Sequence, residues 1–289
     1  MRVRRRVALF GLPLLAGSAL LAAPNPKLTA DDVVVKHLES LGTPEARSSV
    51  TSRIAQGAVR MRIKVNGVGE VNGRAYLFGD PTRFRAALPF DFSDYWGEHF
   101  FSDSERVQVG FSQPGERSPL GEFLRIYQLP LAEGLFGGVL STRWPLLNVS
   151  SRQPRLDYDG VKKIDGKQAH LILYRTRKGR SEVTTQLYFD LETFHHLRSV
   201  YTVNVVSAVG RTIESSSQQQ ERRFSVEENF SDFRAFSGMT LPTRWRIRSV
   251  IDGQLSTERE WDVTFAVITH NAEIDPANFV IGPSKVRGE

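Results

Sequence analysis

Six histidines are the side chains in this 289-residue sequence best suited to proton transfer or metal binding. His195 and His196 are adjacent, and adjacent residues on a strand point to opposite faces, so the two cannot readily share one metal ion. His99 has Glu98 and Asp103 nearby and is a candidate for a hydrolytic or metal site, although a surface loop is the favoured interpretation. The remaining histidines stand apart from one another at positions 37, 170 and 270.

The motifs of common catalytic sites are absent from the sequence. Neither HExxH nor CxxC occurs, and the lack of any cysteine excludes disulfides, thiolate metal sites and cysteine nucleophiles. Gly-Phe-Ser at 110–112 and Phe-Ser-Gly at 236–238 are not GxSxG nucleophile elbows. The glycines of 134–138 lack the lysine of a phosphate-binding loop. We therefore predict no catalytic residue, no cofactor and no metal, and expect a protein that is not an enzyme.

The N-terminus has the pattern of a secretory signal peptide. Residues 1–6 contain four arginines and no acid, and the uncharged stretch VALFGLPLLAGSALLAA follows and ends in small residues. Cleavage after Ala19 or after Ala22 fits, and the second site gives a signal peptide of residues 1–22. An uncleaved anchor is the alternative, but the apolar run is near the lower limit of the roughly 20 residues that a spanning helix needs. The pattern predicts export to the periplasm, with no stable transmembrane segment after cleavage.

The charge of the chain gives no indication of nucleic acid binding. The full sequence carries +6, and removing residues 1–22 removes four arginines and no acid, which leaves +2. Arginines still alternate along two predicted strands, at positions 60 and 62 and at 244, 246 and 248. We interpret these rows as solvated faces, with contact to anionic lipid headgroups or an acidic partner as the alternative.

Period-two alternation dominates the chain after residue 50. Residues 28–50 are the exception, because Val34, Val35, Leu38 and Leu41 recur at helical spacing before Gly42, and a second short helix follows. In AVRMRIKV, by contrast, apolar residues alternate with arginine and lysine, as in a strand with one buried face. About ten such strands follow one another with mostly short connections. Short connections require antiparallel neighbours, so we predict a mainly β, α+β domain over residues 23–280 with a tail over 281–289.

The stretch 118–147 interrupts this pattern. It is the most apolar and least strand-like part of the predicted mature chain, and it contains Phe123, Ile126 and Tyr127 at helical spacing. We expect a helical insertion that either fills the concave face of the sheet as a fixed plug or covers a pocket as a mobile lid. The plug is the favoured alternative.

Several segments together resemble the LolA/LolB family of periplasmic carriers of outer-membrane lipoproteins. They are the helical LTADDVVVKHLESLG before AVRMRIKV, the later LYFDLETFHHLRSVYT and FSDFRAFSGMTLPTRWRI, and the ending NAEIDPANF. The resemblance spans about residues 28–279, and this chain is longer than the typical carrier in the region of 112–147. It implies a strongly curved antiparallel sheet that forms an unclosed β-barrel covered by a few helices. It also implies a concave apolar face that binds acyl chains.

Aromatic residues are the candidates for lining such a cavity. A sheet of about ten strands tends to curl, and a curled sheet that does not close leaves a hollow that apolar side chains line. Ordinary core packing is the favoured interpretation for any single aromatic residue. The candidates are Phe84, Phe90, Phe92, Trp96, Phe100, Phe123, Phe136, Trp144 and Trp245.

Three hypotheses for function follow from the sequence. The favoured one is a periplasmic carrier that binds lipid or lipoprotein acyl chains in an open apolar cavity. The second is a non-enzymatic envelope sensor or assembly module, with a filled barrel and an outer-membrane or other envelope protein as its partner. The third, an enzyme at the barrel mouth, requires a cluster of polar groups with perturbed pKa values in the cavity.

Overall fold

The computed structural model describes residues 28–64, 68–177, 181–205, 222–252 and 257–282. The predicted signal peptide of residues 1–22, the first five residues of the predicted domain and most of the predicted tail lie outside these ranges. No helix in the described part of the chain is long and apolar enough to cross a membrane.

Two helices open the described chain, as predicted. Helix α1 spans Ala30–Leu41 and α2 spans Pro44–Ser48. Thr29 caps α1 in a reciprocal capping box, because its hydroxyl accepts from the Asp32 backbone N–H while the Asp32 carboxylate accepts from the Thr29 N–H. Gly42 ends the helix at φ 136°, a backbone conformation that favours glycine.

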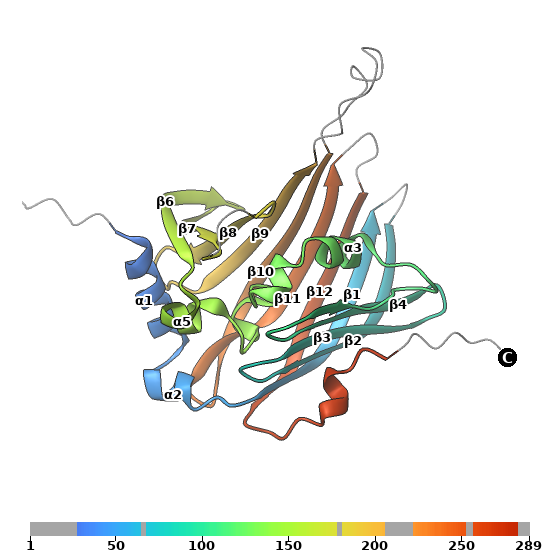
Figure 1. Ribbon diagram of the computed structural model, residues 1–289, viewed down its shortest axis with the longest axis horizontal. Helices are drawn as coiled ribbons and strands as arrows, with labels where there is room; N and C mark the ends of the chain where they lie inside the picture. The colour runs from blue at the N-terminus through green and yellow to red at the C-terminus, as the bar shows by residue number, and fades with distance from the viewer. Residues whose placement is uncertain (1–27, 65–67, 178–180, 206–221, 253–256, 283–289) are drawn as a thin grey trace, which may run out of the picture.

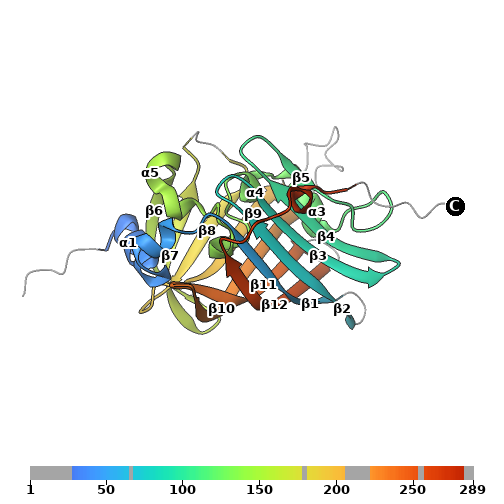
Figure 2. The ribbon, with the colours of Figure 1, turned by 90° about the horizontal axis from the view of Figure 1, so that it is seen from below.

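One antiparallel sheet of twelve strands contains most of the remaining residues. Its order is β5-β4-β3-β2-β1-β12-β11-β10-β9-β8-β7-β6, so strands are paired with their neighbours in sequence except where β1 pairs with β12. Strands β5 and β6 are at opposite edges, so the sheet is not closed, and Figure 2 shows its curvature. The strands are β1 Arg53–Lys64, β2 Val68–Gly79, β3 Phe84–Phe92, β4 Tyr95–Ser102, β5 Val107–Val109, β6 Arg155–Ile164, β7 Lys167–Arg175, β8 Thr184–Asp190, β9 His196–Val205, β10 Arg222–Phe236, β11 Met239–Asp252 and β12 Thr257–His270.

The sheet therefore confirms the mainly β, unclosed architecture, with two more strands than the ten or so expected. Strand β6 has the weakest sequence pattern. It is an edge strand with charged, largely exposed side chains, and its pairing with β7 is irregular between Tyr158 and Val161. Charges and bulges of this kind protect an edge strand against pairing with another chain, and they also obscure the period-two signal.

The arginine rows are mostly paired with carboxylates on the neighbouring strands. Arg62 contacts Glu70 at 3.0 Å, Arg244 contacts Asp262 at 2.6 Å and Arg248 contacts Glu258 at 3.1 Å. These cross-strand pairs belong to the outer face of β1, β2, β11 and β12. On this face most of the arginines are therefore paired with carboxylates of neighbouring strands, rather than forming a row of unpaired cations.

The segment between β5 and β6 lies across the concave side of the sheet (Figure 1). We call residues 118–152 the plug. Leu131, Leu135, Phe136 and Leu146 of the plug are completely buried, so hydrophobic packing against the sheet holds the segment in place. Its helices are α3 Pro119–Ile126, α4 Leu129–Ala132, η1 Gly138–Leu140, η2 Pro145–Asn148 and α5 Val149–Arg152.

Candidate functional site: an amphipathic groove on the outer face of β3–β5

A glycine at the start of β4 decides which side chains reach the outer face. Gly97 has φ 110°, and a Cβ there would lie 1.9 Å from the Leu88 carbonyl oxygen, so only glycine fits. The β3–β4 register is irregular between Pro89 and Phe92, opposite this position. Such a bulge shifts the alternation of side chains. As a result Trp96 and His99 both face the outer groove, whereas Phe100 packs against Phe136 of the plug.

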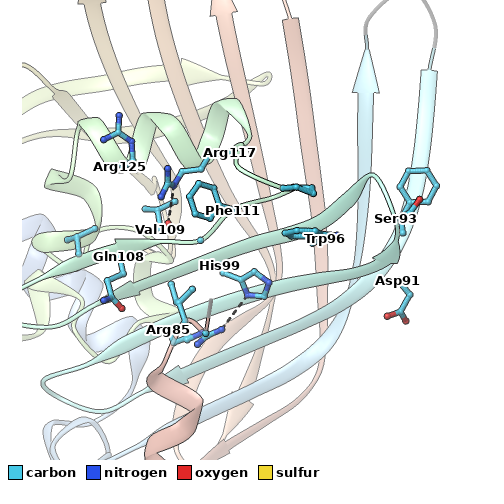
Figure 3. A pocket seen from close by; sticks show the side chains of 16 residues that line it. Arg85, Asp91, Ser93, Trp96, His99, Gln108, Val109, Phe111, Arg117 and Arg125 are labelled. Carbon is cyan, nitrogen blue, oxygen red and sulfur yellow. Dashed lines mark hydrogen bonds between the residues drawn. The ribbon is translucent and has the colours of Figure 1, made fainter. Parts of the chain in front are cut away.

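The groove has a volume of about 1290 Å³ and lies between the outer face of β3–β5, the loop 110–117 and the end of the described chain. Figure 3 shows Trp96 and His99 on β4, with Phe111 and Arg117 opposite them. The η3 turn, Pro276–Phe279, leads into this end segment and is anchored by Phe279, which packs between Arg83 and Phe101. The lining residues are Arg85, Asp91, Phe92, Ser93, Trp96, His99, Val107, Gln108, Val109, Gly110, Phe111, Pro114, Arg117, Arg125, Ile281 and Gly282.

Two arginines of the groove are held in place by neutral groups. The guanidinium of Arg117 lies 4.1 Å from the centroid of the Phe111 ring, and its Nε donates to the Val109 carbonyl at 3.1 Å. Arg85 donates to the Val280 carbonyl and lies 3.4 Å from His99 Nδ1. Burial, and secondarily the positive charge of Arg85, lowers the pKa of His99 to about 4. His99 is therefore neutral at pH 7 and its Nδ1 can accept from Arg85.

The group His99, Glu98 and Asp103 does not form a joint site. Glu98 is buried on the inner side, where it accepts a hydrogen bond from Tyr95, and His99 faces the groove. Asp103 accepts from the backbone N–H groups of Glu105 and Arg106 in the next turn. Glu98 and His99 are thus on opposite faces of strand β4, and Asp103 is in the turn that follows it. The expected surface loop is therefore a strand and a turn. No group of three or more metal-ligating side chains occurs in the part of the chain that the structure describes.

The nine aromatic candidates divide between two environments. Phe92, whose side chain is 49% exposed, and Trp96, which is half-buried, line the groove. The other seven are at most 6% exposed and belong to the main hydrophobic core beneath and within the plug. These are Phe84, Phe90, Phe100, Phe123, Phe136, Trp144 and Trp245.

Sequence reasoning missed most of the groove. Arg85 and Phe111 come from β3 and from a loop, and nothing in their spacing indicates that they meet. The end segment around Ile281 was predicted to be a tail, yet it forms one wall. Arg117, which lies just before the predicted insertion, was likewise not singled out. Only the contacts made by the folded chain bring these residues together.

A buried carboxylate lies on the inner face, beneath the plug. Glu228 of β10 is completely buried and accepts three hydrogen bonds. The donors are the Gly137 backbone N–H at 2.7 Å, the Tyr201 hydroxyl at 2.7 Å and Trp245 Nε1 at 2.9 Å. Burial raises the pKa of Glu228 to about 7, and the three hydrogen bonds counteract only part of that effect. The carboxylate links the plug backbone directly to the sheet.

Two buried arginines make further polar contacts with the plug. Arg53 of β1 donates to the Val139 and Leu140 carbonyls at 2.6 and 3.0 Å. Arg143 of the plug donates to the Ser102 hydroxyl of β4 at 2.7 Å. Because these buried groups are satisfied across the plug–sheet boundary, moving the plug would leave several of them without partners. In this structure these contacts hold the plug against the sheet.

The adjacent histidines occupy different environments. His195 stacks on Phe233 with ring centroids 4.3 Å apart, whereas His196 is completely buried against Trp144. Trp144 Nε1 in turn lies 3.2 Å from Nε2 of His37, which is also completely buried. Burial lowers the pKa of both His37 and His196, so these rings pack as neutral groups inside the core.

No family model matches the chain, and no curated protein is significantly similar to it in sequence. Solved structures do resemble it. A LolA superfamily protein from Nitrosomonas europaea is 12% identical, with a TM-score of 0.46, over 88% of this chain and 99% of that protein.

Two further solved structures show similarity of the same degree. A domain from Vibrio parahaemolyticus, named for outer membrane lipoprotein sorting, is 10% identical, with a TM-score of 0.44 over 86% of this chain and 97% of that domain. A DUF1329 family protein from Desulfovibrio piger is 10% identical, with a TM-score of 0.42 over 87% and 97%. These similarities concern overall shape and do not indicate the function of this chain.

Proposed function

We propose that this chain is a non-catalytic carrier that binds the acyl chain of a lipid or lipoprotein in the outer groove. The observation that carries the proposal is the groove itself. It is larger than the ~300–1,000 Å³ of ordinary ligand pockets, and Phe92, Trp96, Phe111, Val109 and Ile281 give it an apolar lining. Burying each methylene of an alkyl chain contributes about 0.8 kcal/mol, so affinity should rise about fourfold for each carbon added.

The proposed place of action is the periplasm. The basic N-terminus followed by a short apolar stretch supports export, and a carrier outside the cytoplasm would meet acyl chains at the two membrane surfaces. The seven buried aromatic candidates would contact a ligand only if the plug left the concave face. For the plugged state we therefore assign ligand contact to Phe92 and Trp96.

Trp96 makes the proposal directly measurable. Three of the four tryptophans, Trp144, Trp245 and Trp261, are at most 1% exposed, whereas Trp96 lines the groove. A brominated fatty acid quenches tryptophan fluorescence on contact. Titration into the mature protein should therefore quench the Trp96 part of the emission in a saturable way. The Trp96→Phe variant should lose this quenching, whereas Tyr127→Phe, a change outside the groove, should keep it.

Native mass spectrometry of protein purified from the periplasm provides the second measurement. A stoichiometric acyl adduct that disappears on organic extraction would support the carrier and identify the class of its cargo. A clean apo mass together with no saturable Trp96 quenching would refute the proposal.

The filled concave face favours one alternative, an envelope sensor or assembly module that binds a protein partner. The plug occupies the space that acyl chains would take in an open half-barrel. A photocrosslinking amino acid placed at Phe92, which is exposed, separates the two functions in cells. Protein adducts without lipid adducts would support the module, and lipid adducts would support the carrier.

A further inference from the structure

The groove has an excess of positive charge, which narrows the class of ligand that it can bind. We propose that it selects acyl ligands with an anionic headgroup, a carboxylate or a phosphate, and that Arg85 and Arg117 bind this headgroup. The inference rests on the proposed function, because it assigns the polar end of the ligand whose acyl chain the groove would bury.

The distribution of ion pairs supports this assignment. On the outer face of β1, β2, β11 and β12, arginines such as Arg62 and Arg244 contact carboxylates at 2.6–3.0 Å. Neither Arg85 nor Arg117 makes an ion pair with any residue that the structure describes. Asp91 is the only carboxylate among the described residues of the groove lining, and it lies 3.5 Å from Arg74.

The surroundings of Arg85 leave part of its guanidinium available. Among the residues that the structure describes, the buried Nε of Arg85 has no hydrogen-bond partner, and the two Nη atoms hydrogen-bond only to the Val280 carbonyl and His99. Both partners are neutral, because His99 is an uncharged imidazole at pH 7. A partly desolvated guanidinium without a counter-ion binds a carboxylate or phosphate more strongly than it would in water.

Arg117 presents its charge in a second way. It stacks on Phe111, which fixes the plane of the guanidinium beside an aromatic wall of the groove (Figure 3). Arg125 also lines the groove, but Glu122 contacts it at 2.5 Å and neutralises most of its charge. Among the described residues that line the groove, the arginines without an ion pair are therefore Arg85 and Arg117. They adjoin the same apolar surface, which matches a ligand with a charged end and an apolar chain.

The test compares brominated stearoyl ligands that share a chain and differ in headgroup. Stearic acid supplies a carboxylate, lysophosphatidic acid a phosphate and monoacylglycerol a neutral headgroup. Trp96 quenching by wild type should show tighter binding of one or both anions, by tenfold or more, and the preference should shrink as salt is added. Whichever anion binds more tightly identifies the headgroup, a fatty acid or a phospholipid.

Three variants test the assignment to individual residues. Arg85→Met and Arg117→Met should each weaken anion binding about tenfold and leave monoacylglycerol binding unchanged. Arg155→Met, a change on the distant edge strand β6, should alter neither. Arg85→Lys keeps the charge but loses the planar fork, so it should recover only part of the affinity, and it serves where the methionine variant fails to fold.

The outcomes separate the two proposals. Equal affinity for neutral and anionic headgroups, or anion binding that is unchanged in both methionine variants, would overturn the headgroup assignment and leave the carrier in place. Absence of binding by all three ligands would instead refute the proposed function, and the headgroup assignment with it.

Discussion

Replacing Glu228 with glutamine should change how the stability of the protein depends on pH. In the folded protein burial raises the pKa of this carboxyl from 4.5 to about 7, so folding favours its protonated form. Glutamine has the same shape and stays neutral at every pH. Its Oε1 can accept from Gly137 N–H and Trp245 Nε1 as the carboxylate does, and its amide can donate to the Tyr201 hydroxyl.

The size of the effect follows from the pKa values. Below pH 4.5 the carboxyl is protonated in the folded and unfolded states alike, and its favourable contribution to folding is fully present. As pH rises from 4.5 to 7 the unfolded state loses its proton first, so the stability of wild type falls. A tenfold change in proton affinity is worth about 1.4 kcal/mol, so the total loss is about 3 kcal/mol, most of it between pH 5 and 8.

The buried histidines act in the opposite direction. His37 has a pKa of about 3 in the folded protein against 6.5 ordinarily, so its contribution to stability is lost as pH falls below 6.5. Wild type alone would therefore show a mixed pH profile. The difference in unfolding free energy between Glu228→Gln and wild type cancels the histidine contributions, because both proteins contain the same histidines.

Urea unfolding followed by circular dichroism at pH 5, 6, 7 and 8 measures this difference. The stability of Glu228→Gln relative to wild type should rise by about 2–3 kcal/mol from the lowest to the highest pH. Glu98→Gln, at a second buried carboxyl with a raised pKa, is the matched comparison and should show a change of the same sign. A difference that stays constant within about 0.5 kcal/mol would refute a raised pKa at Glu228 and the burial from which it was inferred.

Three further predictions concern the plug and the groove. Arg53→Met should lower the unfolding free energy by about 2–4 kcal/mol in urea, because two buried carbonyls of the plug lose their donor, and Arg155→Met should leave it unchanged. Gly137→Ala should lower the melting temperature more than Gly115→Ala does; both have positive φ, but only at 137 would a Cβ meet a side chain, 2.9 Å from Phe84 Cζ. Acrylamide should quench mainly the emission of Trp96, and a Trp96→Phe protein that stays equally quenchable would contradict the burial of the other three tryptophans.

Local sequence was sufficient to predict the elements wherever a single physical pattern dominates. In AVRMRIKV the apolar positions alternate because β1 has one face against the core, and Val59 and Met61 are each 2% exposed. Val34, Leu38 and Leu41 at helical spacing before Gly42 likewise predict α1, which spans Ala30–Leu41. Antiparallel order followed from the short connections alone. These features depend on neighbours in the chain, and the sequence contains that information directly.

Only the tertiary structure decided where the aromatic and charged residues act. The sequence offered nine aromatic residues as equals, yet Trp245 is completely buried in the core. Trp96 instead lines the groove, because the bulge at Gly97 shifts the alternation of β4 by one position. Arg85 and Arg117 come from separate parts of the chain and line the same groove. Burial and unpaired charge arise from contacts between distant residues, which no local periodicity records, so the site became visible only in the folded chain.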